Sequence, residues 1–270
     1  MTRTTTRRRS PVRRSPVAAF ALLLVALIVM GLIYSAVSGF SGRADAASVN
    51  SSASQIDTGK QLYLESCSSC HGLAAEGTQN GPTLIGVGAA AVDFQVGTGR
   101  MPASYSGGIQ VPRKPVQFSD DQVAALAAYI ASLSPGPAIP SAEDLDYTDA
   151  SLSAGGELFR TNCAQCHNFA AQGGALTDGK YAPNLTQDSA KHLYEAMLTG
   201  PQSMPVFGNA TLRPQDKQAI IKYVKTLSVQ SNPGGASLGR VGPVTEGLVG
   251  WLVGLGALIG VAVWIGVKAA

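Results

Sequence analysis

All four cysteines of the 270-residue chain, and two of its three histidines, lie in two copies of one short pattern. The pattern is Cys-x-x-Cys-His, from Cys67 to His71 and again from Cys163 to His167. Two cysteines at this spacing can form thioethers with the two vinyl groups of one haem, and the adjacent histidine can then coordinate the iron. The sequence therefore predicts two covalently bound haem c groups, held by Cys67, Cys70, Cys163 and Cys166.

Two other uses of these cysteines have to be weighed. Four cysteines in two CxxC pairs can bind one zinc ion, and CxxC pairs can also act as redox disulfides. A single zinc site would have to join two pairs that lie far apart, each within its own copy of a repeated domain. Neither use requires a histidine after each pair, so haem attachment is favoured.

The chain around the two motifs is a duplicated domain. Both halves show, in the same order, a glycine before the motif, a Pro-x-Leu turn after it, a Thr-Gly pair, a Met-Pro pair and an apolar segment with a tyrosine. These landmarks are Gly59 and Gly155, Pro82 and Pro183, Thr98 and Thr199, Met101 and Met204, and Tyr129 and Tyr223.

The sixth position on each iron is expected to be filled by methionine, whose thioether raises the reduction potential relative to a second histidine. Met101 is the candidate in the first domain, whereas the second domain offers Met197 and Met204. Because Thr98 aligns with Thr199, Met197 falls opposite Val96, an apolar helix position where methionine typically packs in a core. The predicted axial ligands are His71 and Met101 in the first domain, and His167 and Met204 in the second.

Each copy is predicted to be helical, and no strand-like alternation stands out. Asp57 or Thr58 is expected to cap the helix before the first motif, and Ser119 to begin a later helix with an apolar stripe at helical spacing. Pro214 suits the first turn of the corresponding helix in the second copy. The predicted fold class is therefore all-α, with two tandem small helical haem domains and a transmembrane helix at each end.

Three further features lead to weaker expectations. The third histidine, His192, is expected to lie exposed on a helix surface without binding iron. The carbonyl groups of Pro82 and Pro183 are expected to orient the ligand imidazoles, as acceptors near metal sites do, or else these are ordinary turn prolines. The segment 105–118 has no counterpart in the second copy, and is either a docking surface or a loop of variable length.

Both ends of the chain predict membrane attachment. Residues 1–16 carry six arginines and no acid, and the apolar segment that follows is long enough to span a bilayer. This segment is predicted to be a retained signal anchor, with a cleaved signal peptide as the alternative because Ala44-Asp45-Ala46 could be a cleavage site. A second apolar segment near the C-terminus ends at Lys268. The arginine-rich tail indicates cytoplasmic termini and an extracytoplasmic middle.

The predicted organisation has seven parts. They are a cytoplasmic Arg-rich tail (1–16), a membrane anchor (17–38), a first domain (50–134), a linker (135–150), a second domain (151–229), a tether (230–246) and a transmembrane helix (247–267). Without the tail arginines and Lys268, 13 basic residues remain against 17 acidic ones, so nothing indicates nucleic-acid binding.

These motifs resemble a known family. A CxxCH motif followed by Gly81-Pro82 or Ala182-Pro183 and then by a Met-Pro loop is the pattern of small, helical, Met-ligated cytochromes c. Two such domains between apolar ends are similar to the dihaem cytochrome c subunit of the actinobacterial menaquinol–cytochrome c reductase (the cytochrome bc complex). The stretch 81–104 is especially similar to that subunit.

The resemblance implies a dihaem cytochrome c of the cell membrane with its haem domains on the extracytoplasmic side. It would take electrons from the Rieske centre and pass them to the copper centre of a haem-copper oxidase. The implied partners are the cytochrome b and Rieske iron–sulfur subunits, the terminal oxidase subunits and the membrane. The chain would be the electron-transfer subunit of that reductase, with no catalytic residue or substrate site of its own.

Two alternative functions stay open at this point. The chain could be a dihaem electron-carrier subunit of another membrane oxidase or dehydrogenase, which would share every haem ligand. It could also be a dihaem enzyme such as a peroxidase, which would need one iron without its methionine.

Overall fold

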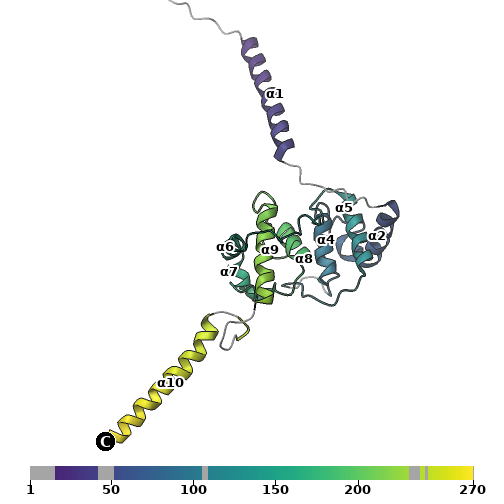
Figure 1. Ribbon diagram of the computed structural model, residues 1–270. Helices are drawn as coiled ribbons and strands as arrows, with labels where there is room; N and C mark the ends of the chain where they lie inside the picture. The colour runs from purple at the N-terminus through teal and green to yellow at the C-terminus, as the bar shows by residue number, and fades with distance from the viewer. Residues whose placement is uncertain (1–15, 42–51, 105–108, 231–237, 241–242, 270) are drawn as a thin grey trace, which may run out of the picture. The chain divides into compact units, whose positions relative to one another are not determined.

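The computed structural model describes residues 16–41, 52–104, 109–230, 238–240 and 243–269, and it divides into two compact units after Asp45 (Figure 1). The described part of the first unit is helix α1 (Pro16–Ser41). The second unit contains the two repeated domains and helix α10 (Pro243–Ala269). The predicted mostly helical architecture with two small domains is confirmed, and it carries in addition a pair of two-residue strands that the sequence did not indicate.

The two terminal helices are both apolar. The described side chains of α1, at residues 20–32, are exposed throughout. Within α10, Gly247–Lys268 is 22 residues long with none of its window buried, and among the described residues it is the helix long and apolar enough to cross a membrane. At 1.5 Å per residue it spans about 33 Å, which matches the hydrocarbon core of a bilayer.

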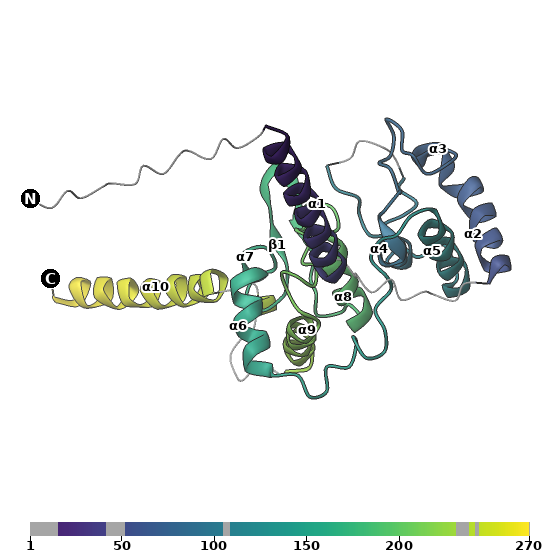
Figure 2. The same ribbon diagram turned by 90° about the horizontal axis from the view of Figure 1, so that it is seen from above.

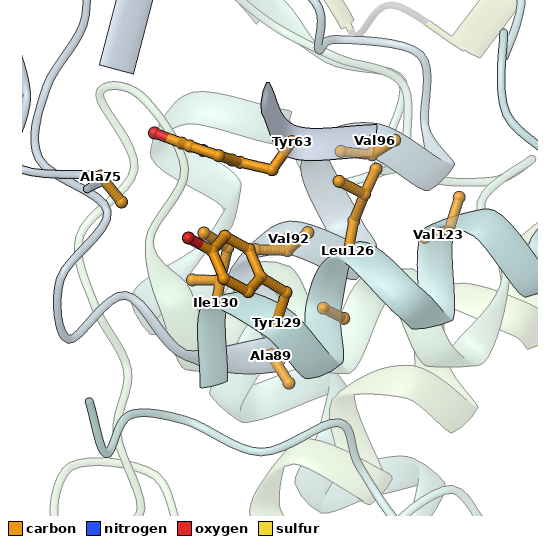
Figure 3. Close-up of a cluster of buried hydrophobic side chains, with 10 residues drawn as sticks. Tyr63, Ala75, Ala89, Val92, Val96, Val123, Leu126, Tyr129 and Ile130 are labelled. Carbon is orange, nitrogen blue, oxygen red and sulfur yellow. The ribbon is translucent and has the colours of Figure 1, made fainter. Parts of the chain in front are cut away.

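The described residues of the first domain form four helices. They are α2 (Ala53–Ser66), α3 (Ser68–His71), α4 (Gly88–Gly97) and α5 (Asp120–Leu133). Helix α5 packs against both α2 and α4. Figure 3 shows the resulting core, in which Tyr63, Leu126 and Ile130 meet at the centre and are each no more than 2% exposed.

The second domain repeats this arrangement. Its elements are α6 (Leu152–Asn162), α7 (Ala164–His167), β1 (Gly174–Ala175), the 3-10 turn η1 (Thr177–Gly179), β2 (Tyr181–Ala182), α8 (Ala190–Thr199) and α9 (Pro214–Val229); a second 3-10 turn, η2 (Leu238–Arg240), follows. Helix α6 packs on α9 as α2 packs on α5. The aromatic pairs also correspond, since Tyr63–Tyr129 and Phe159–Tyr223 both have ring centroids 5.3 Å apart.

The helix starts are set by local capping. Ser119 accepts a hydrogen bond from the Gln122 backbone in a full capping box, and α9 begins at Pro214, so both predictions are confirmed. The predicted cap at Asp57 or Thr58 is wrong, because α2 begins earlier, at Ala53, with Ser52 as its cap. Serine is as good a cap as aspartate, and helix α2 includes the residues between Ser52 and Asp57 as well.

The two repeated domains contact each other through equivalent helices, α4 and α8, which lie side by side in Figures 1 and 2. The ring of His192 on α8 meets the ring of Phe94 on α4 edge-on, with centroids 6.1 Å apart. Lys191 Nζ lies 2.7 Å from Asp93 Oδ2. The prediction that His192 is exposed is wrong, because the packing of the two domains covers this helix face and leaves the side chain only partly accessible.

The described part of the unmatched segment, residues 109–118, also contacts the second domain. The side chain of Gln110 exchanges two hydrogen bonds with the Tyr181 backbone, at 2.8 and 2.9 Å. The side chain of Gln202 donates to the Val111 carbonyl at 3.1 Å. Arg113 Nη1 lies 2.7 Å from Asp188 Oδ1. This segment therefore joins the two domains, whatever else it contacts.

Glu195 lies on α8 at the centre of this interface. It is 0% exposed, and neither carboxylate oxygen has a hydrogen-bond partner in the described part of the chain. Burial, and then the neighbouring Asp93 carboxylate, raises the pKa of Glu195 to about 9. Glu195 therefore carries a proton at neutral pH, because a second bare carboxylate beside Asp93 would be uncompensated.

We expect Gly59→Ala to destabilise the first domain. A Cβ at Gly59 would overlap the Ala125 carbonyl and lie 2.9 Å from Tyr129 Cβ, where α2 crosses α5. Such overpacking lowers the free energy of unfolding by about 1–3 kcal/mol, whereas glycine to alanine in an open helix raises it by about 1 kcal/mol. Guanidinium denaturation followed by circular dichroism measures whether the free energy of unfolding falls or rises in Gly59→Ala. Lys60→Ala, an exposed change on the same helix, is the control, and a stabilised Gly59→Ala protein would contradict the close crossing.

We also expect Glu195→Gln to reduce the pH dependence of stability. The pKa of Glu195 in the folded protein lies above its unfolded value, so between the two the folded chain holds a proton that the unfolded chain lacks. The free energy of unfolding then falls as pH rises, by up to about 1.4 kcal/mol per pH unit.

Denaturation of the full chain at pH 6 and pH 8.5 measures this slope. The charged neighbours Asp93 on α4 and Lys191 and His192 on α8 are unchanged in the Glu195→Gln variant. Glu157→Gln, which removes an exposed carboxylate on α6, is the control. Equal slopes for wild type and Glu195→Gln would show that Glu195 is ionised in the folded protein.

Candidate haem sites

Each CxxCH motif forms one helical turn at the end of a longer helix. Cys67 closes α2 through a bond from its backbone N–H to the Tyr63 carbonyl (2.8 Å), and Cys70 and His71 then both donate to the Cys67 carbonyl. Cys163, Cys166 and His167 repeat this pattern at the end of α6. A turn of this kind places cysteines three residues apart on one side, with the histidine next to them.

The residue after each histidine must adopt a left-handed conformation. It is Gly72 in the first domain (φ 84°) and Asn168 in the second (φ 50°). Glycine has no Cβ to obstruct this conformation, and asparagine tolerates it better than most residues. The Asn168 side chain also accepts a hydrogen bond from the Ala170 backbone N–H at 2.8 Å, which stabilises the turn.

The orientation of both imidazoles is fixed by proline carbonyls, as predicted. His71 Nδ1 lies 2.7 Å from the Pro82 carbonyl oxygen, and His167 Nδ1 lies 2.9 Å from that of Pro183. When Nδ1–H donates to a carbonyl, Nε2 carries the lone pair that can bind a metal. Burial, opposed by the Pro183 hydrogen bond, lowers the pKa of His167, which favours the neutral imidazole that ligation requires.

The cysteines do not fit the other two uses. None of the four forms a disulfide, and Cys67 and Cys163 pack against separate cores. Burial raises the pKa of the Cys67 thiol to about 11 and that of Cys163 to about 12. Redox-active cysteines instead have lowered pKa values that favour the thiolate.

The two methionines of the second domain lie in different surroundings. Met204 lines a cleft together with Cys163, Cys166 and His167. Met197 is 4% exposed in the hydrophobic core, and it is not part of that cleft lining. In the first domain Met101 packs, partly buried, against the same core cluster as Cys67. The structure therefore brings the predicted ligands of the second domain together and leaves Met197 apart.

The cleft in the second domain has an empty space of about 880 Å³, including the part open to solvent. Its lining is mostly apolar, with side chains such as Leu176, Leu193 and Phe207. Free thiols, an imidazole with Nε2 available and a thioether surround this apolar space, and these are the groups that attach and ligate haem c. The residues present therefore fit a haem.

Sequence reasoning missed part of this cleft. Phe94, Arg100 and Gln110 of the first domain line it together with the second-domain residues, and so does His192. The one signal for this was the segment 105–118, which has no counterpart in the second copy and lies directly after the Met101 loop. The motifs of each copy predict that copy's own ligands, and they carry no information on which side chains the other copy supplies.

Family models of known proteins match both domains. A family model described as "Cytochrome c" matches residues 56–134, and one described as "Cytochrome C oxidase, cbb3-type, subunit III" matches residues 150–224. A cbb3-type cytochrome c oxidase subunit CcoP of Rubrivivax gelatinosus is 33% identical over 104 residues, which cover 37% of this chain and 34% of that protein.

Two other relatives cover most of the chain. The cytochrome bc1 complex cytochrome c subunit of Mycobacterium tuberculosis is 47% identical over 229 residues, covering 83% of this chain and 81% of the relative. The subunit of the same description from Corynebacterium efficiens is 44% identical over 228 residues, covering 78% and 76%. The resemblance seen in the motifs thus extends across both domains, and the chain belongs to the family of actinobacterial cytochrome bc1 complex cytochrome c subunits.

Proposed function

We propose that the chain relays electrons from the Rieske centre of a menaquinol-oxidising cytochrome bc complex to the copper centre of a terminal haem-copper oxidase. The observation that carries this proposal is the repetition of one ligand arrangement. In each domain a CxxCH turn presents an imidazole held by a proline carbonyl, and a methionine packs against the same core. Family membership supports the assignment to a bc complex.

The proposed cofactors are two covalently bound haem c groups. Cys67 and Cys70 attach the first, and Cys163 and Cys166 attach the second. The proposed axial ligands are His71 with Met101, and His167 with Met204. Haem c, when bound, supplies reversible one-electron chemistry at its iron.

The side chains of this chain would fix the position of each haem and the reduction potential of its iron. With one histidine and one methionine as ligands, each iron would have no position left for a substrate. Methionine ligation raises the reduction potential relative to a second histidine. The chain therefore acts as the electron-transfer subunit of a quinol–cytochrome c reductase without a catalytic residue or substrate site of its own.

The proposed partners are the cytochrome b and Rieske iron–sulfur subunits and the subunits of the terminal oxidase. The apolar helix α10 supports attachment to the cell membrane. The arginines of residues 1–16, which lie outside the described residues, indicate that the N-terminus is cytoplasmic and the haem domains extracytoplasmic. The proposed domain limits remain 50–134 and 151–229.

The alternative of a subunit from another membrane oxidase has some support in the likeness to CcoP. That likeness covers 37% of this chain, whereas the bc1 relatives cover about twice as much at higher identity. The match to the Mycobacterium tuberculosis bc1 subunit runs over 229 residues of this chain, whereas the match to CcoP runs over 104. The bc complex is therefore the better-supported assignment.

We expect Met204→Ala to remove the sixth ligand from one of two haems. The oxidised protein should then show one high-spin and one low-spin haem by electron paramagnetic resonance, and the affected haem should have a lower potential. Met197→Leu, a change of similar volume in the core, should leave both haems low-spin. Loss of a low-spin signal in Met197→Leu instead would reverse the assignment of the ligand.

Purification of the chain from its native membrane tests the function directly. We expect two covalent haems per chain, b-type haem, a Rieske iron–sulfur signal and terminal oxidase subunits in the same preparation. Fewer than two covalent haems would refute the proposed cofactors. A preparation with two haems but without b-type haem would refute the assignment to a bc complex.

A further inference from the structure

Arg100 belongs to the first domain, yet its side chain lines the haem cleft of the second. It follows helix α4 and directly precedes Met101, the proposed ligand of the first iron. The backbone N–H groups of Arg100 and Met101 both donate to the Gln95 carbonyl, each at 2.9 Å. The position of Arg100 is therefore fixed by the end of α4.

The charge of Arg100 is buried, and among the described residues it forms no ion pair. The residue is 8% exposed, and its guanidinium lies over the Phe94 ring, 4.7 Å from the centroid. Its side chain donates one hydrogen bond, to Thr98 Oγ1 at 2.6 Å. Within the described residues no carboxylate forms an ion pair with it. A guanidinium has five N–H donors, and burying its charge without a partner is unfavourable.

The described residues supply one carboxylate near Arg100, and it already has a partner. Asp188 is the acidic residue of the cleft lining, but Arg113 Nη1 already lies 2.7 Å from its Oδ1. Lys180, a second cation, also lines the cleft. The charged lining is thus positive once Asp188 is paired, so the cleft favours a ligand that brings its own carboxylates.

We propose that Arg100 of the first domain binds a propionate carboxylate of the haem held by the second domain. This inference rests on the proposed attachment of haem to Cys163 and Cys166. A carboxylate is the anion that a guanidinium fork binds best, through paired and charge-assisted hydrogen bonds. The propionates are the anionic groups of haem, whose remaining ring surface suits the apolar wall.

The inference makes the second haem site dependent on the first domain. One peptide bond joins Arg100 to Met101, so the residue that anchors one cofactor is bonded to the ligand of the other. The internal alignment gives no reciprocal contact, because Pro201 of the second copy occupies the place of Arg100. Arg100 is thus a positioning residue that fixes the spacing between the two haem sites.

The test compares Arg100→Gln with Arg100→Lys in the full, haem-loaded chain by redox titration. Removing a cation beside a propionate disfavours the reduced, more negative haem. We expect Arg100→Gln to weaken reduction of the second haem about tenfold, or about 59 mV for one electron, and Arg100→Lys to restore most of this shift. Each change is also combined with Met204→Ala, which is expected to make the second haem high-spin and so to distinguish its signal from that of the first. Arg160→Gln, an exposed charge removal on α6, should have no effect.

Loss of haem from the second domain alone in Arg100→Gln would also support the inference. An unchanged potential of the second haem at full haem content, or a shift confined to the first haem, would overturn it. If Arg100→Gln does not fold, an experimental structure of the wild-type haem-loaded chain decides. A propionate oxygen within about 3.2 Å of the Arg100 guanidinium supports the inference, and its absence there overturns it.

These measurements use the isolated chain, so they separate this inference from the proposed relay. A chain that carries both haems but does not co-purify with b-type haem would refute the relay and leave the Arg100 contact standing. A chain without haem at Cys163 and Cys166 would refute both.

Discussion

The hydrogen bond from each histidine Nδ1 to a proline carbonyl is the constraint on which the rest of each domain depends. It joins the CxxCH turn to the loop that follows it, and it leaves Nε2 of His71 and of His167 as the ring nitrogen available to a metal. Both partners must then be held rigidly. The helix before the motif holds the histidine, and the turn around the proline holds the acceptor, so a small domain needs little more than these elements and the methionine loop.

The duplication preserves this constraint together with the packing that supports it. A glycine lets α2 cross α5 closely in the first domain, and Gly155 lets α6 cross α9 in the second, where a Cβ would overlap the Ala219 carbonyl. The aromatic pair beside each crossing is also kept. The copies differ on the helices through which they meet, where Phe94 of α4 corresponds to Glu195 of α8 in the internal alignment. The shared positions build each site, and the differing ones build the contact between the sites.

The sequence predicted the parts of the fold that depend on local signals. Ser119 and Pro214 mark helix starts because capping involves residues only a few positions apart, and Met204 follows from comparing one copy with the other. The sequence did not predict the features that depend on contacts between the two domains. His192 looks like a surface residue within its own helix, and only the approach of α4 covers it. Nothing in the loop of Arg100 drew a prediction for this residue, because the neighbouring domain is what makes it part of a cleft.

The contact between the domains buries several charged groups, and each requires its own compensation. Lys191 neutralises Asp93, and Arg113 is paired with Asp188. Glu195 avoids a second negative charge beside Asp93 by keeping its proton, which its raised pKa of about 9 permits. Arg100 cannot use that route, because arginine does not lose its proton in proteins. Among the described residues no carboxylate forms an ion pair with it, so under the proposed contact a haem carboxylate completes the electrostatics of the docked domains. Cofactor attachment and domain docking are therefore expected to stabilise each other.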